Sequence, residues 1–188
     1  MIVLTAYDRF VEQLFEVMKR FTGALSKSGI DYRVIGGMAT FLHVNERSPI
    51  AARLTNDIDA AVRRSDLDSI IQAVAPFGFI YRHAAGVDRL VDSANPDKRS
   101  TVRLIFVREK VRASDLEPVP DFSPAIETME GALVAPVADL VRMKLTSFRL
   151  KDRVHIQDMD GVGLITPEIE SSLPEILRDR LAEVRATE

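Results

Sequence analysis

The most restrictive feature of the sequence is the segment Leu54–Val62, in which two aspartates stand two positions apart in an otherwise mostly apolar run. We predict a strand over residues 56–62. Successive side chains of a strand point to opposite faces, so Asp57 and Asp59 share one face while the apolar residues between them can enter a core. Two adjacent carboxylates repel each other unless a cation is present. Carboxylate oxygens suit Mg²⁺, which proteins commonly hold with one or two carboxylates plus substrate phosphates. The alternative is a solvated sheet edge.

A strand that ends in two glycines lies about twenty residues upstream. Val34 and Ile35 precede Gly36 and Gly37, and a helical pattern follows from Met38. Such a junction places backbone N–H groups and the positive end of a helix beside any bound phosphate. Glycines permit close approach because they carry no Cβ. A plain tight turn is the alternative for this segment alone, but its pairing with the two aspartates favours a phosphate-binding site.

Strand and helix patterns alternate along the chain, which predicts an α/β or α+β fold in one unit. An amphipathic helix is expected first, because apolar residues recur every three to four positions from about 7 to 27. We expect a core over residues 1–135 that includes this helix, and a C-terminal helical segment, residues 136–188, packed on that core. The remaining predicted strands are 32–35, 79–83, 88–91, 101–107 and 132–134, with helices at 38–44 and 66–74, from 136, and from 174.

Composition excludes several classes of site and partner. The 188 residues contain no cysteine, which rules out disulfides, thiolate zinc sites and cysteine nucleophiles. The formal net charge of −3 argues against a dedicated nucleic-acid binder but leaves room for an RNA substrate held by a local basic patch. No apolar run approaches the length of a membrane span. These features are typical of a soluble, cytoplasmic protein.

The spacing of the glycines and aspartates resembles a known signature. Gly36-Gly37 followed by Arg53-x-Thr55-x-Asp57-x-Asp59 is similar to the motif of the polymerase-β-like nucleotidyltransferase superfamily, especially small bacterial branches related to abortive-infection and toxin–antitoxin nucleotidyltransferases. The segments 137–145 and 149–153 are similar to the helical region that follows the sheet there. The resemblance implies a mixed central sheet flanked by helices, two Mg²⁺ ions, a nucleoside triphosphate (NTP) donor and transfer of a nucleotidyl group. It leaves the acceptor open among tRNA, a protein and a small molecule such as an antibiotic, and it raises an antitoxin as a partner.

The resemblance also implies roles for individual residues. Gly36 and Gly37 would contact the triphosphate, and the two aspartates would be the catalytic metal ligands. Arg53 and Thr55 lie just before the aspartates and would contact phosphate or fix the loop. An arginine in the position of Arg53 is, on its own, more often a surface residue.

One part of the superfamily pattern is missing. Members usually carry a third carboxylate on a later strand, where it helps to activate the attacking hydroxyl. The corresponding strand here is 101–107, and Arg103 stands at about the expected position. Asp88 or Asp92 on the preceding strand would be the substitutes, with Asp92 favoured. The missing acid keeps a second function open, a catalytically degenerate member that binds nucleotide or a protein partner.

Two lysines in the C-terminal segment complete the set of candidates. If the helix from residue 136 continues past Thr146 and Ser147, Lys144 and Lys151 fall near the middle of its apolar side. A charge at such a position is costly without an anionic partner, and a triphosphate or an aspartate would supply one. The alternative is snorkelling from a half-exposed helix. The histidines His43, His83 and His155 form no cluster in the sequence, and none is assigned a role.

Overall fold

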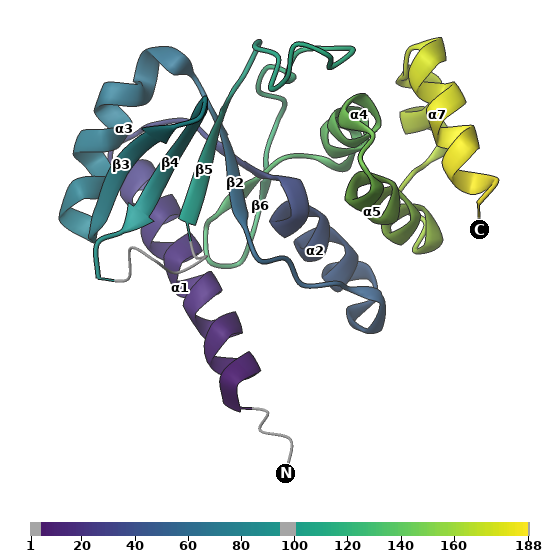
Figure 1. Cartoon of the computed structure of the whole chain (residues 1–188). Helices are drawn as coiled ribbons and strands as arrows, with labels where there is room; N and C mark the ends of the chain where they lie inside the picture. The colour runs from purple at the N-terminus through teal and green to yellow at the C-terminus, as the bar shows by residue number, and fades with distance from the viewer. Residues whose placement is uncertain (1–4, 95–100, 188) are drawn as a thin grey trace.

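The computed structural model describes residues 5–94 and 101–187 of the chain. Its centre is a seven-stranded mixed sheet with the strand order β3-β4-β5-β2-β1-β7-β6 (Figure 1). The strands are β1 (Arg33–Ile35), β2 (Ile58–Val62), β3 (Phe79–Ala84), β4 (Val87–Asp92), β5 (Thr101–Phe106), β6 (Ile126–Glu127) and β7 (Leu133–Val134). The predicted mixed sheet flanked by helices is therefore confirmed.

The pairing of the central strands decides which side chains meet. Strand β2 runs parallel to β5 and antiparallel to β1. Its register sets Asp59 opposite Ile35 on one side and opposite Arg103 on the other. The last residue of β1 is thus beside the aspartate, and the next residue along the chain is Gly36.

The helices divide into two groups around this sheet. They are α1 (Thr5–Lys27), α2 (Gly36–Arg47), α3 (Leu67–Val74), α4 (Val137–Ser147), α5 (Leu150–Gly161), α6 (Pro167–Ser172) and α7 (Glu175–Arg185). Helices α1 and α3 contact each other and strands β5 and β3, respectively. Helix α2 contacts β1 and β2 and also α4 and α5, so it links the sheet to the C-terminal helices (Figure 1).

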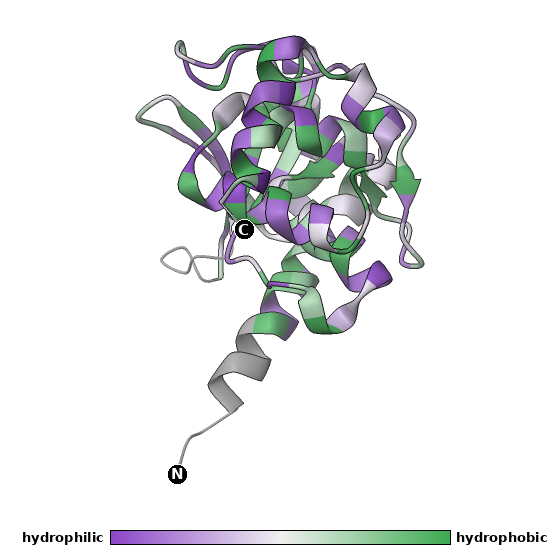
Figure 2. Cartoon of the chain, turned by 90° about the vertical axis from the view of Figure 1, so that its right-hand side faces the viewer, coloured by the Kyte–Doolittle hydropathy of each residue, from purple (hydrophilic) through white to green (hydrophobic). Residues whose placement is uncertain are grey.

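The core follows the apolar patterns seen in the sequence. On α1, the stripe of Leu14, Val17, Phe21 and Leu25 is fully buried. Strand β2 is buried along its whole length; it lies between β1 and β5 in the sheet and is contacted by α2. Seen from the side of the C-terminal helices, hydrophilic and hydrophobic residues alternate along the helical ribbons (Figure 2). None of the helices in the described residues is long and apolar enough to cross a membrane.

The predicted continuous helix from residue 136 is wrong. Helix α4 ends at Ser147, and Phe148 adopts the left-handed conformation with φ 49°. Arg149 then caps the new helix α5, in which the Asp152 carboxylate accepts a hydrogen bond from the Arg149 backbone N–H. Lys144 and Lys151 consequently belong to different helices, and Lys144 is buried whereas Lys151 is exposed.

The strand predicted over residues 56–62 is shorter than expected. Strand β2 begins at Ile58, so Asp59 lies within the sheet while the exposed Asp57 precedes the strand by one residue. The Asp57 backbone N–H donates instead to the hydroxyl of Thr55, at 3.4 Å.

Candidate active site

The glycine turn is fitted tightly against the aspartate strand. Gly36 has φ +69°, a conformation that favours glycine. A Cβ built on it would overlap the Asp59 carboxylate, and a Cβ on Gly37 would lie 2.6 Å from Thr55 Oγ1. A side chain at Gly36 would displace Asp59, and one at Gly37 would displace Thr55, so the two glycines allow the close approach of the turn.

The same turn is the start of a twelve-residue helix that lacks a side-chain cap. The N-cap residue of α2, Ile35, provides no side-chain hydrogen bond, and its first turn carries no acidic residue. The first backbone N–H groups of a helix have no partner within the helix and form its positive end. In α2 these donors begin at Gly36, immediately beside Asp59.

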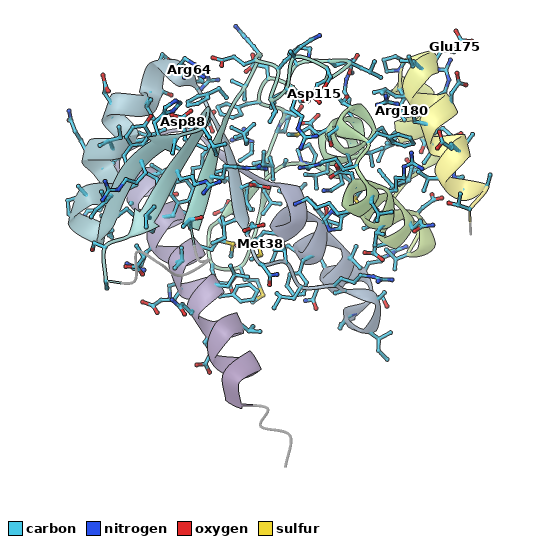
Figure 3. All side chains as sticks on the ribbon, viewed as in Figure 1. Met38, Arg64, Asp88, Asp115, Glu175 and Arg180 are labelled. Carbon is cyan, nitrogen blue, oxygen red and sulfur yellow. The ribbon has the colours of Figure 1, made fainter. Side chains whose placement is uncertain are left out.

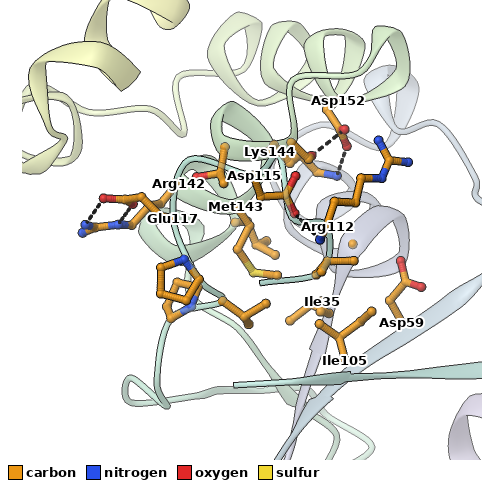
Figure 4. Close-up of a pocket in the computed structure, with 18 of the residues that line it drawn as sticks. Ile35, Asp59, Ile105, Arg112, Asp115, Glu117, Arg142, Met143, Lys144 and Asp152 are labelled. Carbon is orange, nitrogen blue, oxygen red and sulfur yellow. Dashed lines mark hydrogen bonds and ion pairs between the residues drawn. The ribbon is translucent and has the colours of Figure 1, made fainter. Parts of the chain in front are cut away.

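A cavity with a volume of about 80 Å³ opens in front of this turn (Figure 4). Gly36, Asp59 and Arg103 line it from the sheet side, whereas Met143 and Lys144 line it from α4. The segment 111–120 and the start of α5 close the remaining sides, and Asp115 lies on the first of these. A space of this size is smaller than a typical pocket for a whole drug-sized ligand, which measures roughly 300–1,000 Å³. It would accept only part of a nucleotide, such as its phosphates.

Lys144 brings a buried positive charge into the cavity. Its side chain is 6% exposed, and its ammonium lies 3.6 Å from the Asp152 carboxylate. Burial lowers the pKa of Lys144 to about 8, although Asp152 and Asp59 both favour the charged form. Burial likewise opposes ionisation of Asp152, but hydrogen bonds from Arg149 and Ser147, each 2.7 Å, hold the pKa of that carboxyl at about 2. Asp152 is therefore shared between two cations, and the Lys144 ammonium has no partner within 3.5 Å among the described residues.

Asp59 is neutralised by an arginine from the neighbouring strand. Arg103 Nε donates to Asp59 Oδ1 at 2.8 Å, and the two side chains are 30% and 12% exposed. The partners are directly opposite in the parallel pair β2–β5. One oxygen of Asp59 thus faces Arg103, and the other faces Gly36.

Comparison with known proteins identifies the fold. No protein-family model matches the sequence, and no curated protein matches it. The crystal structure of an antigenic nucleotidyltransferase-like protein from Paracoccidioides brasiliensis aligns with a TM-score of 0.62 and 18% identity, over 94% of this chain and 88% of that one. The crystal structure of ANT(2")-Ia in complex with adenylyl-2"-tobramycin aligns with a TM-score of 0.51 and 13% identity, over 94% and 98%. This chain has the nucleotidyltransferase fold.

Neither expected substitute for the third carboxylate of nucleotidyltransferases lies at the site. Asp88 and Asp92 alternate along β4 with Arg89, which is paired with Arg103, so both aspartates point to the face opposite Asp59. Asp92 binds Arg20 of α1 at 2.6 Å. Asp88 accepts hydrogen bonds from Tyr81 and His83 and lies near Arg64 at one end of the sheet (Figure 3). The interpretation of Asp92 as the replacement acid is wrong because strand alternation turns it away.

Three other residues predicted from the sequence to contact the nucleotide, Arg53, Thr55 and Lys151, are absent from the cavity lining. Arg53 is 69% exposed and forms an ion pair with Asp158 of α5 at 2.9 Å. Thr55 contacts the glycine turn rather than the cavity, and Lys151 is exposed and is absent from the cavity lining. The convergence of the Asp57 and Asp59 carboxylates on a single metal ion stays a prediction.

The structure adds a residue that the sequence did not single out. The His155 ring on α5 would lie 3.5 Å from a Cβ on Gly37, and its Nδ1 is buried with no hydrogen-bond partner in the described part of the chain. Burial lowers the pKa of His155 to about 4, assisted by the charge of Lys144. A neutral ring therefore packs against the turn. Only the break between α4 and α5 brings it there, so spacing in the sequence carried no signal.

The donor groups can be tested against the Mg²⁺ that this fold implies. Within residues 5–94 and 101–187, no three acidic or histidine side chains come close enough to form a metal site of their own. Asp57 and Asp59 supply two carboxylates, and Arg103 already occupies one oxygen. Carboxylate oxygens are ligands that suit Mg²⁺, so Asp57 and Asp59 would hold one ion, with phosphate oxygens and water as its other ligands, which is the usual mode for this ion.

Proposed function

We propose that the protein transfers a nucleotidyl group from an NTP, in the presence of Mg²⁺, to the hydroxyl of an acceptor. One observation carries the proposal. Gly36 at the uncapped start of α2 lies directly against the Asp59 carboxylate and faces a cavity that contains Lys144. A helix N-terminus, a carboxylate suited to Mg²⁺ and a buried ammonium together match the three needs of a bound triphosphate. The nucleotidyltransferase fold is consistent with this chemistry.

Each group at the site has a separate role in this proposal. The N–H groups at Gly36 and Gly37 would hold phosphate oxygens, and Lys144 would neutralise charge that builds on the leaving group. Asp57 and Asp59 would hold Mg²⁺, which when bound polarises the phosphate and stabilises the oxygens entering and leaving. The acceptor oxygen forms a bond to the α-phosphorus, the bond from that phosphorus to the bridging oxygen breaks, and pyrophosphate departs.

The acceptor hydroxyl must also lose its proton. Four carboxylates line the cavity, and three of them are ion-paired: Asp59 with Arg103, Glu117 with Arg142, and Asp152 with Lys144 and Arg149. The fourth, Asp115, is buried and accepts a hydrogen bond from the Arg112 backbone N–H, with no side-chain partner among the described residues. We propose Asp115 as the group that takes the proton. A positioned base contributes on the order of 10² to 10⁴ in rate.

A transfer assay with α-labelled NTPs and Mg²⁺, offered cell RNA, cell protein and small hydroxyl-bearing compounds, tests the proposal. Wild type should label one acceptor class, and Asp57→Ala and Asp59→Ala should abolish labelling. Asp115→Asn should retain NTP binding and lose transfer by about 10² or more. Asp179→Ala removes an exposed carboxylate on α7 and should change nothing. Transfer that survives Asp59→Ala would overturn the mechanism.

A second candidate function is nucleotide binding without transfer. The Arg103–Asp59 ion pair favours it, because the arginine stands where the fold usually carries a third acid. Equilibrium dialysis with labelled NTP separates the two functions. Mg²⁺-dependent binding with no transfer to any acceptor class would establish this candidate.

Three finer assignments rest on the sequence resemblance and composition. We propose a toxin–antitoxin role, a cytoplasmic location and, as the architectural unit, a core of residues 1–135 that carries the helical segment 136–188. Expression with and without neighbouring genes would test the first, since a toxin should arrest growth only without its partner. Truncation after residue 135 would test the last. It removes Lys144 and the packing of α4 on α2, and it should abolish NTP binding.

A further inference from the structure

Three arginines form a row across the sheet that ends at the candidate site. Arg82 of β3 is directly opposite Arg89 of β4, and Arg89 is directly opposite Arg103 of β5. Arg103 is in turn opposite Asp59 of β2. Directly opposed residues share a face, and neighbouring strands are about 4.8 Å apart. The backbone positions of Arg82 and Arg103, two strands apart, are therefore separated by roughly 10 Å.

Of the three arginines only Arg103 has an acidic partner among the described residues, Asp59. Arg82 and Arg89 are exposed and make no side-chain hydrogen bond or ion pair with the described residues. The acids of β4, Asp88 and Asp92, point to the opposite face, where Tyr81, His83 and Arg20 bind them. Like charges directly opposite each other in a sheet are destabilising. An anion bound from outside would remove that cost.

A second cavity adjoins the site at Arg103, the last arginine of the row. Its volume is about 330 Å³, and it shares Arg103 and Arg112 with the cavity that contains Asp59. Four cationic side chains and two acidic ones line it: Arg64, Arg103, Lys110 and Arg112 against Asp88 and Glu109. Lys110 and Arg112 are exposed, and neither side chain is paired with a described residue. A polyanion that follows the row therefore finds further positive charge at the entrance to the site.

Apolar side chains accompany the arginines on the same face. Ile80 is opposite Val91, two residues along the strands from Arg82 and Arg89, and Ile80 is 43% exposed. Exposed apolar groups beside a row of cations suit a ligand that carries both bases and phosphates. A small polycationic acceptor would instead meet like charge along the whole path.

We infer that the acceptor is a single-stranded nucleic acid, whose phosphates lie along Arg82, Arg89 and Arg103 and whose terminal hydroxyl reaches the Asp57–Asp59 site. This inference rests on the proposed function, since it names the acceptor of that same reaction. The overall charge of −3 is compatible with it, because Arg82, Arg89, Lys110 and Arg112 form a local group of exposed cations without acidic partners in the described residues. Binding to a phosphodiester backbone gives affinity with little sequence preference.

Fluorescence anisotropy with a labelled 20-nucleotide mixed-sequence RNA, measured over a series of salt concentrations, tests the inference. The double variant Arg82→Ala/Arg89→Ala changes exposed side chains only. Each phosphate that no longer meets an arginine should reduce the slope of log K against log salt by about 0.7, so the slope of the double variant should be smaller by about 1.4. Arg82→Lys/Arg89→Lys keeps the charge and should retain most of the slope. Lys27→Ala/Arg47→Ala removes two exposed cations from α1 and α2 and should have no effect.

Measuring NTP binding to the same variants separates this inference from the function on which it rests. NTP affinity should be unchanged in Arg82→Ala/Arg89→Ala. Wild type that binds NTP but no RNA at low salt, or RNA binding that the double variant leaves intact, would overturn the inference and leave the proposed function standing. RNA binding along the row by a protein that binds no NTP would retain the nucleic-acid surface and overturn the proposed function. A stronger response to duplex DNA than to the single strand would also contradict the inference.

Discussion

Gly36 meets two separate requirements at one position. Its positive φ disfavours any other residue, and its missing Cβ leaves room for the Asp59 carboxylate. Gly29, at the end of α1, shares the first requirement, with φ +66°, but has nothing within 4 Å of a built Cβ. Comparing substitutions at Gly36 and Gly29 therefore separates the cost of backbone strain from the cost of displacing Asp59.

We expect Gly36→Ala to lower the free energy of unfolding by more than Gly29→Ala does. The backbone conformation alone costs about 1–2 kcal/mol, and both variants carry that cost. Only the first displaces Asp59, so it should also weaken NTP binding. Urea denaturation and NTP titration of both variants provide the measurement, and equal losses of stability would contradict the close approach of Gly36 to Asp59.

The lowered pKa of Lys144 predicts that NTP affinity and the free energy of unfolding change in opposite directions as pH rises. With its pKa at about 8, the ammonium is lost as pH rises above 8, so NTP affinity should fall between pH 7.5 and 9.5. The folded-state pKa lies below that of the unfolded chain, which binds more protons between about pH 8 and 10.5. The contribution of this group to stability therefore rises over that window.

Substitution isolates this effect from the other charged groups around the cavity. The charged neighbours of Lys144 are Asp152, Asp59, Arg149 and Lys151. Lys144→Met should weaken NTP binding and flatten its pH profile, whereas Arg142→Ala, which removes a cation paired with Glu117, should leave the profile intact. Isothermal titration at several pH values measures both, and an unchanged profile in Lys144→Met would return Lys144 to a purely structural role.

At the scale of elements, local patterns predicted β1, β2, α1 and the glycine turn, because each has an alternation or period that packing does not override. The junction of α4 and α5 was not predictable in this way. Its residues Thr146 and Ser147 are compatible with a helix, and the break depends on Phe148 in a left-handed conformation and on Asp152 folding back onto Arg149. The same break brings Asp152 to Lys144 and His155 to Gly37. The sequence did not predict the contacts of these two α5 residues because it did not predict the break.

The junction should therefore be sensitive to Asp152. Asp152→Asn keeps the size of the side chain but leaves the buried Lys144 without its anion, and breaking a buried pair costs about 3–5 kcal/mol. Lys144→Met in the same chain should recover part of that loss, because the two effects are coupled. A double-mutant cycle by urea denaturation measures the coupling, and additive losses would contradict the pairing.

Acid titration gives an independent measure of the same residue. The folded-state pKa of Asp152, about 2, lies below the ordinary value of 3.8. Its stabilisation is present above pH 3.8 and is lost as pH falls through 2. Asp152→Asn should remove this part of the acid dependence.

At the scale of the whole molecule, the sheet order brings residues from three distant regions of the chain, around Gly36, Asp59 and Arg103, to one cavity. Arg103 could be placed beside Asp59 from the sequence only by assuming the superfamily's strand order, and its ion pair required the register of β2 against β5. The row of arginines likewise appears only when three strands are aligned. Neither has a sequence motif, because each depends on the packing of distant segments.

We expect Mg²⁺ alone to leave the melting temperature of wild type unchanged, because Arg103 already neutralises Asp59. Mg²⁺ with NTP should raise the melting temperature, because a ligand at 100 times its Kd adds about 2.7 kcal/mol to the free energy of unfolding. Arg103→Asp creates a third carboxylate at the site and should make stability respond to Mg²⁺ alone. Thermal unfolding with and without chelator measures this, with Arg89→Asp on the same face as the control. An identical response of both variants would contradict the role of Arg103.

In the Arg103–Asp59 pair, the counter-ion of the aspartate is a side chain that is covalently part of the same protein. A dissolved ion can be diluted away or removed by a chelator, whereas a guanidinium attached to the adjacent strand cannot. If Asp59 holds Mg²⁺ as proposed, Arg103 would have to give up its contact with Asp59 Oδ1 for the ion to bind there. The released arginine would then lie at the end of its row, free to meet the arriving strand. Metal occupancy and acceptor capture would in this way be linked through the rotation of a single residue.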